Sequence, residues 1–225
     1  MDDVTAIVRD LCAISVDDGI TFDADSIAGE DIREADVYGG VRVRLVARLA
    51  QARIPVELDV GFGDAVVPTP QWASLPTLLD HDPPQVLVYP REAVVAEKVE
   101  AMVSLGVTNS RMKDFYDVAR LAESMAFDGP TLARSLRATF DRRGTPFPSG
   151  EPLVLTDGFL ADPDRQVQWR AFVRRGRLAA PPDTGAMTEA LRRFVLPVIT
   201  PAGTDDAFEA ESRPGGPWTP MELRR

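Results

Sequence analysis

The chain has 225 residues, of which 44% are hydrophobic, and its 35 acidic and 25 basic side chains give a formal net charge of −10. This length and composition allow a buried core in one or two domains. The acidic balance argues against a general nucleic-acid-binding surface, although it leaves room for a local basic cleft.

The N-terminus and the single cysteine indicate the class of protein. Asp2 and Asp3 stand where a signal peptide would have a basic lead, and no uncharged apolar run reaches the roughly 20 residues of a membrane span. Cys12 cannot form an intrachain disulfide, and its apolar neighbours favour a buried role. We therefore expect a cytoplasmic protein with no membrane span.

The first third of the chain predicts a helix followed by strands. Apolar residues recur at helical spacing over 3–16, and a short strand is expected around 20–28. Residues 41–46 and 54–60 each alternate between apolar and polar side chains, which is typical of strands. Because a short connection joins these two runs, they predict an antiparallel hairpin.

The rest of the chain predicts mostly helix. Residues 65–90 are proline-rich, with a short strand expected at 86–89. Helices are expected at 91–105, 111–125, 128–142, 162–177 and 184–196. Asp128-Gly129-Pro130 and Asp162-Pro163 have the residue types that begin helices. The prediction is an α+β protein with a sheet domain at 1–90, a helical domain at 91–198 and a disordered tail at 199–225.

Lysine is rare in this chain, since 23 of the 25 basic residues are arginine. Lys98 projects from the middle of the apolar stripe of the helix at 91–105, four residues from both Val94 and Met102. Such a lysine either extends along the apolar surface to solvent or is held by a buried anionic partner. Lys113 points to the solvated face of the next helix, and this position gives only a weak explanation for lysine in place of arginine.

The helix at 111–125 also directs charges toward its apolar side. Arg111 lies on that side and Asp114 lies at its edge, while Ser110 can cap the helix. Arg111 and Asp114 are three residues apart, so they can form a simple pair that joins two helices. The alternative is a polar pocket that holds Lys98, Arg111 and Asp114, because charges directed inward are costly without partners.

Glu57 and Asp59 share one face of the predicted strand at 54–60. They are either solvated surface carboxylates or ligands of a divalent metal. Phosphoryl and nucleotidyl transfer require carboxylates around Mg²⁺ and a cation on the triphosphate. Asp59 would supply one of the carboxylates, and Lys98 would supply the cation. His81 lies in a polar loop without a second histidine, so we expect a solvated side chain and not a metal ligand.

Three segments carry a resemblance to a known family. They are Ile54-Pro55-Val56-Glu57-Leu58-Asp59-Val60-Gly61-Phe62-Gly63-Asp64, Tyr89 to Met102, and Asn109-Ser110-Arg111-Met112-Lys113-Asp114-Phe115-Tyr116-Asp117. This pattern resembles nucleotidyltransferase toxins of the AbiEii/AbiGii type. The resemblance implies a polymerase-beta type nucleotidyltransferase fold, Mg²⁺, a nucleoside triphosphate, a tRNA or other RNA acceptor, and a cognate antitoxin of a toxin–antitoxin or phage-defence system.

The resemblance also implies roles for individual residues. Lys98 and Asp114 match the motif lysine and aspartate, so catalytic roles are expected for them. Lys98, Arg111 and Asp117 are expected to bind the nucleotide, and Asp59 with Glu57 is expected to bind the metal.

The sequence departs from the family at its first motif, which is Gly-Ser followed about ten residues later by Asp-x-Asp. The chain contains no Gly-Ser, and Gly39-Gly40 is followed by Arg42 and Arg44 in place of carboxylates. We therefore expect an N-terminally truncated relative that is inactive as it stands. Met1 is then a misassigned start, the gene is decayed, or another chain supplies the motif.

Three hypotheses follow for the function. The first is a nucleotidyltransferase toxin, and the second is a non-catalytic relative that binds an antitoxin or RNA. The third is a structural helical protein, for which Lys98→Met would be neutral or stabilising. The reading frame upstream of Met1 separates the first two hypotheses, since an in-frame Gly-Ser and Asp-x-Asp stretch favours the enzyme.

Overall fold

The computed structural model describes residues 2–33, 39–178, 184–204 and 206–221, and the chain forms two compact units, Met1–Asp64 and Ala65–Arg225. The predicted boundary at residue 90 differs from this division, because the proline-rich segment from Ala65 groups with the helices. The α+β class is confirmed, with small antiparallel sheets and several helices. No described helix is long and apolar enough to cross a membrane.

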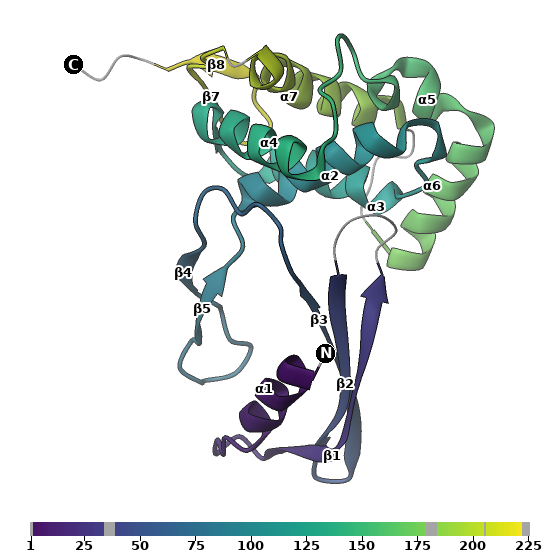
Figure 1. Cartoon of the computed structure of the whole chain (residues 1–225). Helices are drawn as coiled ribbons and strands as arrows, with labels where there is room; N and C mark the ends of the chain where they lie inside the picture. Colours follow the sequence, from purple (N-terminus) through teal and green to yellow (C-terminus); the bar gives the residue numbers. More distant parts are fainter. Residues whose placement is uncertain (1, 34–38, 179–183, 205, 222–225) are drawn as a thin grey trace. The chain divides into compact units, whose positions relative to one another are not determined.

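The first unit, called the sheet unit below, is a three-stranded antiparallel sheet with one helix. Its elements are α1 (Asp2–Cys12), β1 (Ile20–Arg33), β2 (Gly39–Leu49) and β3 (Ala52–Gly61), with sheet order β1-β2-β3. The predicted hairpin at 41–60 is confirmed by the register of β2 with β3. Alternate residues of β2 are buried and α1 lies against this part of the sheet (Figure 1), as period-two patterning requires. Cys12 is half-buried beside this core.

The second unit, called the helical unit below, contains the remaining elements. They are β4 (Gln71–Ser74), β5 (Gln85–Val88), α2 (Arg91–Leu105), η1 (Gly106–Thr108), α3 (Met112–Ser124), β6 (Phe127–Asp128), α4 (Gly129–Arg143), η2 (Leu153–Leu155), α5 (Asp157–Ala161), α6 (Pro163–Gly176), α7 (Thr184–Thr204), β7 (Ala210–Ser212) and β8 (Trp218–Pro220). The helix α4 packs against both α2 and α7, and β4 and β5 form a hairpin that extends away from the helices (Figure 1).

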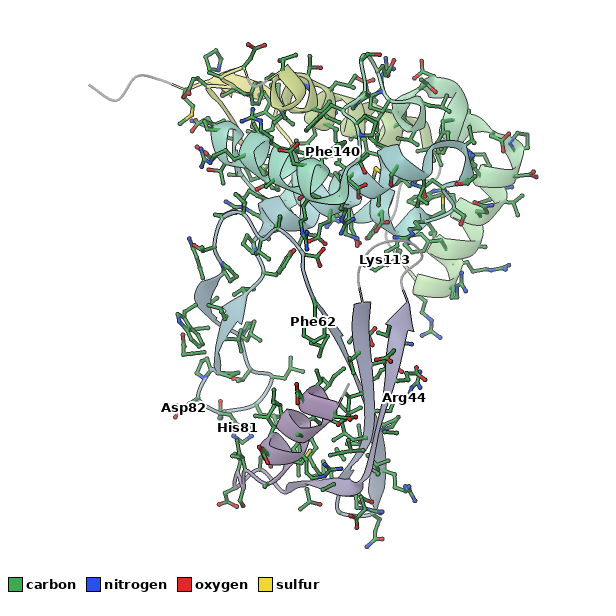
Figure 2. The ribbon with its side chains drawn as sticks, viewed as in Figure 1. Arg44, Phe62, His81, Asp82, Lys113 and Phe140 are labelled. Carbon is green, nitrogen blue, oxygen red and sulfur yellow. The ribbon has the colours of Figure 1, made fainter. Side chains whose placement is uncertain are left out.

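A single large core holds the helices together. Phe115, Phe140 and Trp169 are almost completely buried in it, and Phe140 lies among the helices in Figure 2. Aromatic side chains of this size supply much of the apolar area that a domain buries. This core fixes α2 and α3 against each other, which matters for the charged residues that these two helices carry.

The helix starts follow the predicted signals at two of three places. Asp128 accepts a hydrogen bond from the Thr131 backbone N–H (2.9 Å), and Asp162 accepts from that of Asp164 (3.0 Å). The prediction that Ser110 caps α3 is wrong. The helix begins at Met112, and the Asn109 Oδ1 accepts from the Arg111 backbone N–H (2.8 Å) instead.

The predicted disordered tail differs from the structure over residues 206–221. β7 pairs with β6 and β8, and the Trp218 Nε1 donates a hydrogen bond to the Phe194 carbonyl (2.8 Å). The Trp218 and Phe194 rings also stack, with centroids 5.6 Å apart. The aromatic side chains scattered among the prolines and glycines therefore anchor this segment, which we call the C-terminal clasp.

The clasp leads to a prediction at Gly129. An added Cβ there would lie 2.4 Å from the Ala210 carbonyl oxygen and 2.7 Å from Phe208. We therefore expect Gly129→Ala to destabilise the fold by about 1–3 kcal/mol, although alanine is about 1 kcal/mol better than glycine inside a helix. Urea unfolding measures this, with Gly150→Ala as the control because no atom lies within 4 Å of that position. Equal midpoints for the two variants would show that the clasp does not pack on Gly129.

Candidate functional site

Lys98 meets two carboxylates at the α2–α3 contact of the helical unit. Its Nζ donates a hydrogen bond to Asp114 Oδ1 (2.6 Å) and lies 2.9 Å from Asp117 Oδ2. The three side chains are 17%, 13% and 24% exposed, respectively. Of the two interpretations left open by the sequence, the structure therefore supports a lysine held by anionic partners.

Both lysines of the chain converge on Asp117. Lys113, one turn before Asp117 on α3, donates to Asp117 Oδ2 (2.5 Å). Its side chain is 70% exposed and lies at the surface of the helices (Figure 2), as predicted for the solvated face. The contact with Asp117 explains a lysine at position 113, which the sequence alone did not. We call Lys98, Lys113, Asp114 and Asp117 the lysine–aspartate cluster.

The charges of the cluster support one another. Burial of Lys98 disfavours its charged form, but hydrogen bonds and charges from Asp114 and Asp117 outweigh burial and raise the pKa of Lys98 above its ordinary 10.5. Burial likewise disfavours ionised Asp117, yet hydrogen bonds from Lys113 and Lys98 hold the pKa of Asp117 below its ordinary 3.8. Lys98 and Asp117 therefore each stabilise the charged form of the other.

This arrangement predicts a specific response to acid. Since the folded-state pKa of Asp117 is depressed, its contribution to stability is fully present above pH 3.8 and is lost as the pH falls through the lower folded-state value. We expect the difference in unfolding free energy between wild type and Asp117→Asn to shrink as the pH falls below 3.8. Urea titrations from neutral to acid pH measure it. A difference that stays constant over this range contradicts the assignment.

One donor of Lys98 remains available for a ligand. An ammonium group has three N–H donors, and among the described residues two carboxylates contact the Lys98 Nζ. The side chain is 17% exposed, so the cluster is not sealed from solvent. The two aspartates then orient the cation without consuming all of its hydrogen-bonding capacity.

Arg111 lies outside this cluster. It occupies the N-cap position of α3 and is exposed, so the predicted inward placement beside Lys98 and Asp114 is wrong. The physical reason is that α3 begins at Met112, which removes Arg111 from the helical periodicity on which the prediction depended. Its role in nucleotide binding stays a prediction.

Glu57 and Asp59 form part of a charge ladder across the sheet unit. Arg42 on β2 makes two hydrogen bonds to Asp59, both 2.7 Å, and Arg44 donates to Glu57 (2.8 Å) and pairs with Glu30 on β1 (2.8 Å). Hydrogen bonding to Arg42 is the main cause that lowers the pKa of Asp59. The register of β2 and β3 sets these residues opposite each other, so cross-strand pairing explains the ladder.

The donor set of this ladder does not fit Mg²⁺, which prefers several free oxygen ligands. The arginines occupy the carboxylate oxygens of Glu57 and Asp59. Within the part of the chain that the structure describes, no three His, Cys, Asp or Glu side chains are grouped to hold a metal ion. The metal role of Glu57 and Asp59 stays a prediction that no contact among the described residues supports.

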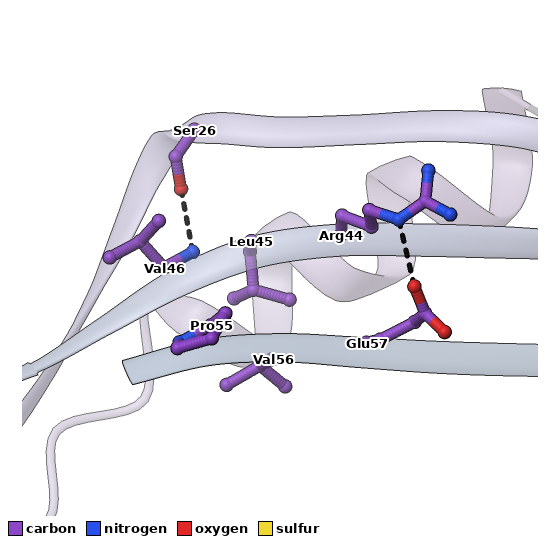
Figure 3. Close-up of a pocket in the computed structure, with 7 residues that line it drawn as sticks. All are labelled: Ser26, Arg44, Leu45, Val46, Pro55, Val56 and Glu57. Carbon is purple, nitrogen blue, oxygen red and sulfur yellow. Dashed lines mark hydrogen bonds and ion pairs between the residues drawn. The ribbon is translucent and has the colours of Figure 1, made fainter. Parts of the chain in front are cut away.

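A pocket of about 550 Å³ lies in the sheet unit beside this ladder (Figure 3). It opens where the register of β1 and β2 shifts between Asp23 and Ala28, and the Ser26 Oγ there accepts a hydrogen bond from the Val46 backbone N–H (2.8 Å). Its lining combines apolar side chains with the Arg44–Glu57 pair. These contacts explain the bulge of β1 and supply no group that is free to react.

Two further contacts support the α2–α3 region, and sequence patterns alone did not identify them. Arg165 of α6 donates to the backbone carbonyls of Asn109 (2.7 Å) and Val107 (2.6 Å), which fixes the loop that leads into α3. Glu100 on α2 is buried and accepts hydrogen bonds from Arg143 (2.7 Å) and Thr145. Both contacts join residues more than 40 positions apart, which local periodicity does not reveal.

Comparison with known protein families identifies the family of this chain. A family model described as nucleotidyl transferase AbiEii toxin, type IV TA system, matches residues 1–199. The match covers the sheet unit, α2 and α3, and it ends within α7 before the C-terminal clasp. No curated protein and no solved structure matches the chain.

Proposed function

The chain belongs to the AbiEii nucleotidyl transferase toxin family of type IV toxin–antitoxin systems, and we propose that its helical unit binds the phosphates of a nucleoside triphosphate at Lys98. The observation that carries the proposal is the ammonium group of Lys98, which two aspartates hold in place with one N–H donor left for a ligand. A fixed cation of this kind stabilises the negative charge that gathers on phosphate oxygens during nucleotidyl transfer.

In the proposed reaction, a hydroxyl oxygen of the acceptor attacks the α-phosphorus of the triphosphate. The bond from that phosphorus to the bridging oxygen breaks, pyrophosphate leaves with the electron pair, and the hydroxyl proton passes to solvent. Lys98 would donate to a phosphate oxygen. Asp114 and Asp117 would act as positioning residues that fix its ammonium group.

We propose further that this chain by itself binds the nucleotide without transferring it. Support comes from the sheet unit, where Arg42 and Arg44 occupy the carboxylates of Asp59 and Glu57. Nucleotidyl transfer requires carboxylates that are free to hold divalent ions on the phosphates. Labelling of RNA by radioactive nucleoside triphosphates and Mg²⁺ with the 225-residue chain alone would contradict this part of the proposal.

The family implies a cognate antitoxin as partner, because its toxins belong to type IV toxin–antitoxin systems. We propose RNA, such as tRNA, as the acceptor, and the cytoplasm as the compartment, since nucleoside triphosphates and such acceptors are found there together. A non-catalytic module that binds antitoxin or RNA is the alternative. It predicts that the loss of Lys98 leaves the binding of those partners unchanged and that nucleotides do not bind.

Equilibrium binding of nucleoside triphosphates tests the central proposal. We expect Lys98→Met to weaken binding by roughly tenfold or more, which corresponds to the 1.5–3 kcal/mol of a hydrogen bond to a charged group. Lys113→Met is the matched control, because it removes the other lysine that contacts Asp117 but lies on the exposed face. Equal loss in both variants, or no detectable binding by wild type, would contradict the assignment to Lys98.

A further inference from the structure

The largest cluster of positive charge along this acidic sequence lies on and just after α6. Residues 165–182 contain five arginines and no acidic residue, so the rest of the chain has 20 basic and 35 acidic side chains. This stretch is therefore positive in a protein with a net charge of −10. It creates a local positive potential that the chain as a whole does not have.

Four of these arginines are exposed and have no carboxylate partner within the described ranges of the chain: Arg170, Arg174, Arg175 and Arg177. The fifth, Arg165, donates to the backbone carbonyls before α3. Among the other exposed arginines of the helical unit, Arg120 pairs with Glu123 (2.8 Å), whereas α6 carries several unpaired arginines within about two turns. We call the four unpaired arginines the α6 basic surface.

The geometry of α6 directs two of these arginines away from its packed side. Trp169 is buried, and its ring contacts Tyr116 of α3 with centroids 6.3 Å apart. At 100° per residue, Arg170 and Arg174 point away from the Trp169 direction and lie one turn apart on the same side. Like charges four residues apart destabilise a helix, so helix stability does not account for this pair.

The helix dipole explains only part of the surface. Arg174 and Arg175 lie in the last turn of α6, where basic side chains are favourable. Arg170 lies a turn earlier, and Arg177 follows the helix. The helix dipole therefore does not account for Arg170 and Arg177.

Arg177 adopts a backbone conformation that costs stability. Its φ of 50° and ψ of 40° lie in the left-handed region, at the position that usually holds glycine after a helix. The adjacent glycine, Gly176, serves a different purpose, because a Cβ there would lie 2.9 Å from Leu178. Residues in this strained region often belong to binding sites. An arginine at a position where glycine would be less strained therefore suggests that its side chain has a binding role.

We propose that the α6 basic surface binds the phosphodiester backbone of the acceptor RNA. Guanidinium groups match phosphate oxygens in geometry and charge, and four of them within eight residues suit a polyanion more than a single small ion. The surface lies on the helix that packs on α3, which carries Asp114 and Asp117. The identity of the polyanion as RNA rests on the proposed function, whereas the contact with phosphates rests on the charge of α6.

The test is fluorescence anisotropy with a labelled RNA stem–loop over a series of KCl concentrations and without nucleotide. The slope of log K against log salt should flatten by about 1.4 to 1.8 when two phosphate contacts to the loop or the stem are lost, and affinity should fall roughly tenfold. The variant is Arg170→Gln/Arg174→Gln. The control is Arg120→Gln/Arg193→Gln, which changes the net charge equally at two exposed arginines that have carboxylate partners.

Arg177→Gly separates binding from folding. We expect it to bind RNA roughly three- to tenfold more weakly, while its melting temperature stays equal to that of wild type or rises because the strain is relieved. A role in helix termination alone predicts no change in affinity. Circular dichroism and the same anisotropy titration give both values on one sample.

The outcomes distinguish this inference from the proposed function. Equal salt slopes for the two double variants would overturn the α6 assignment and leave nucleotide binding at Lys98 untouched. Displacement of RNA by poly-glutamate of equal charge would overturn the choice of a nucleic acid and assign the surface to an acidic protein. Retained RNA binding with no nucleotide binding would contradict the proposed function alone.

Discussion

Lys98→Met is expected to destabilise the fold by about 2–4 kcal/mol, because it leaves Asp114 and Asp117 close together and largely buried with one lysine fewer. The range lies somewhat below the 3–5 kcal/mol of a fully buried pair, since both aspartates retain some solvent contact and Lys113 still neutralises Asp117. Urea unfolding of wild type and variant measures the difference.

A compensated variant distinguishes stability from function. In Lys98→Met/Asp114→Asn/Asp117→Asn no buried charge is left unpaired, so we expect most of the lost stability to return. Nucleotide binding should not return, because the cation is still absent. A single Lys98→Met variant as stable as wild type would instead favour the structural hypothesis, in which the charges on α2 and α3 are incidental.

Arg143→Met is expected to destabilise the helical unit by about 3 kcal/mol or more. The Glu100 side chain is only 4% exposed, and Arg143 is its charged partner at 2.7 Å, with Thr145 as a second donor. Without the guanidinium group, an ionised carboxylate in this position has only one neutral hydrogen-bond donor among those contacts.

The paired control for this variant is Arg143→Met/Glu100→Gln. A neutral amide in place of the carboxylate removes the unpaired charge, so we expect the double variant to be more stable than Arg143→Met. Thermal unfolding of both proteins checks this order. If Glu100→Gln further destabilises Arg143→Met, the buried carboxylate is stabilised by something other than Arg143.

The sequence predicted most where local periodicity decides the structure. The bounds of α2 were predicted without error, and Lys98 was recognised as a lysine on a packed face. The hairpin of β2 and β3 followed from two alternating runs. The charge ladder could also have been derived, because the register that pairs Arg42 with Asp59 follows from that hairpin.

The predictions that differ from the structure depend on a single residue or on distant contacts. A shift of one residue at the start of α3 moved Arg111 out of the cluster and left Asp117 as the second partner of Lys98. The C-terminal clasp is held by contacts of Trp218 with α7 and of β7 with β6, which no local pattern indicates. Pro- and Gly-rich composition alone predicted disorder there.

The most direct test of the central claim uses the two lysines of the chain. Lysine labelled with ¹³C at Cε gives one NMR signal each from Lys98 and Lys113. We expect a nucleoside triphosphate to shift the Lys98 signal in a saturable manner and to leave the Lys113 signal nearly unchanged. An unchanged Lys98 signal at saturating nucleotide, or a shift confined to Lys113, would contradict the claim that Lys98 binds the triphosphate.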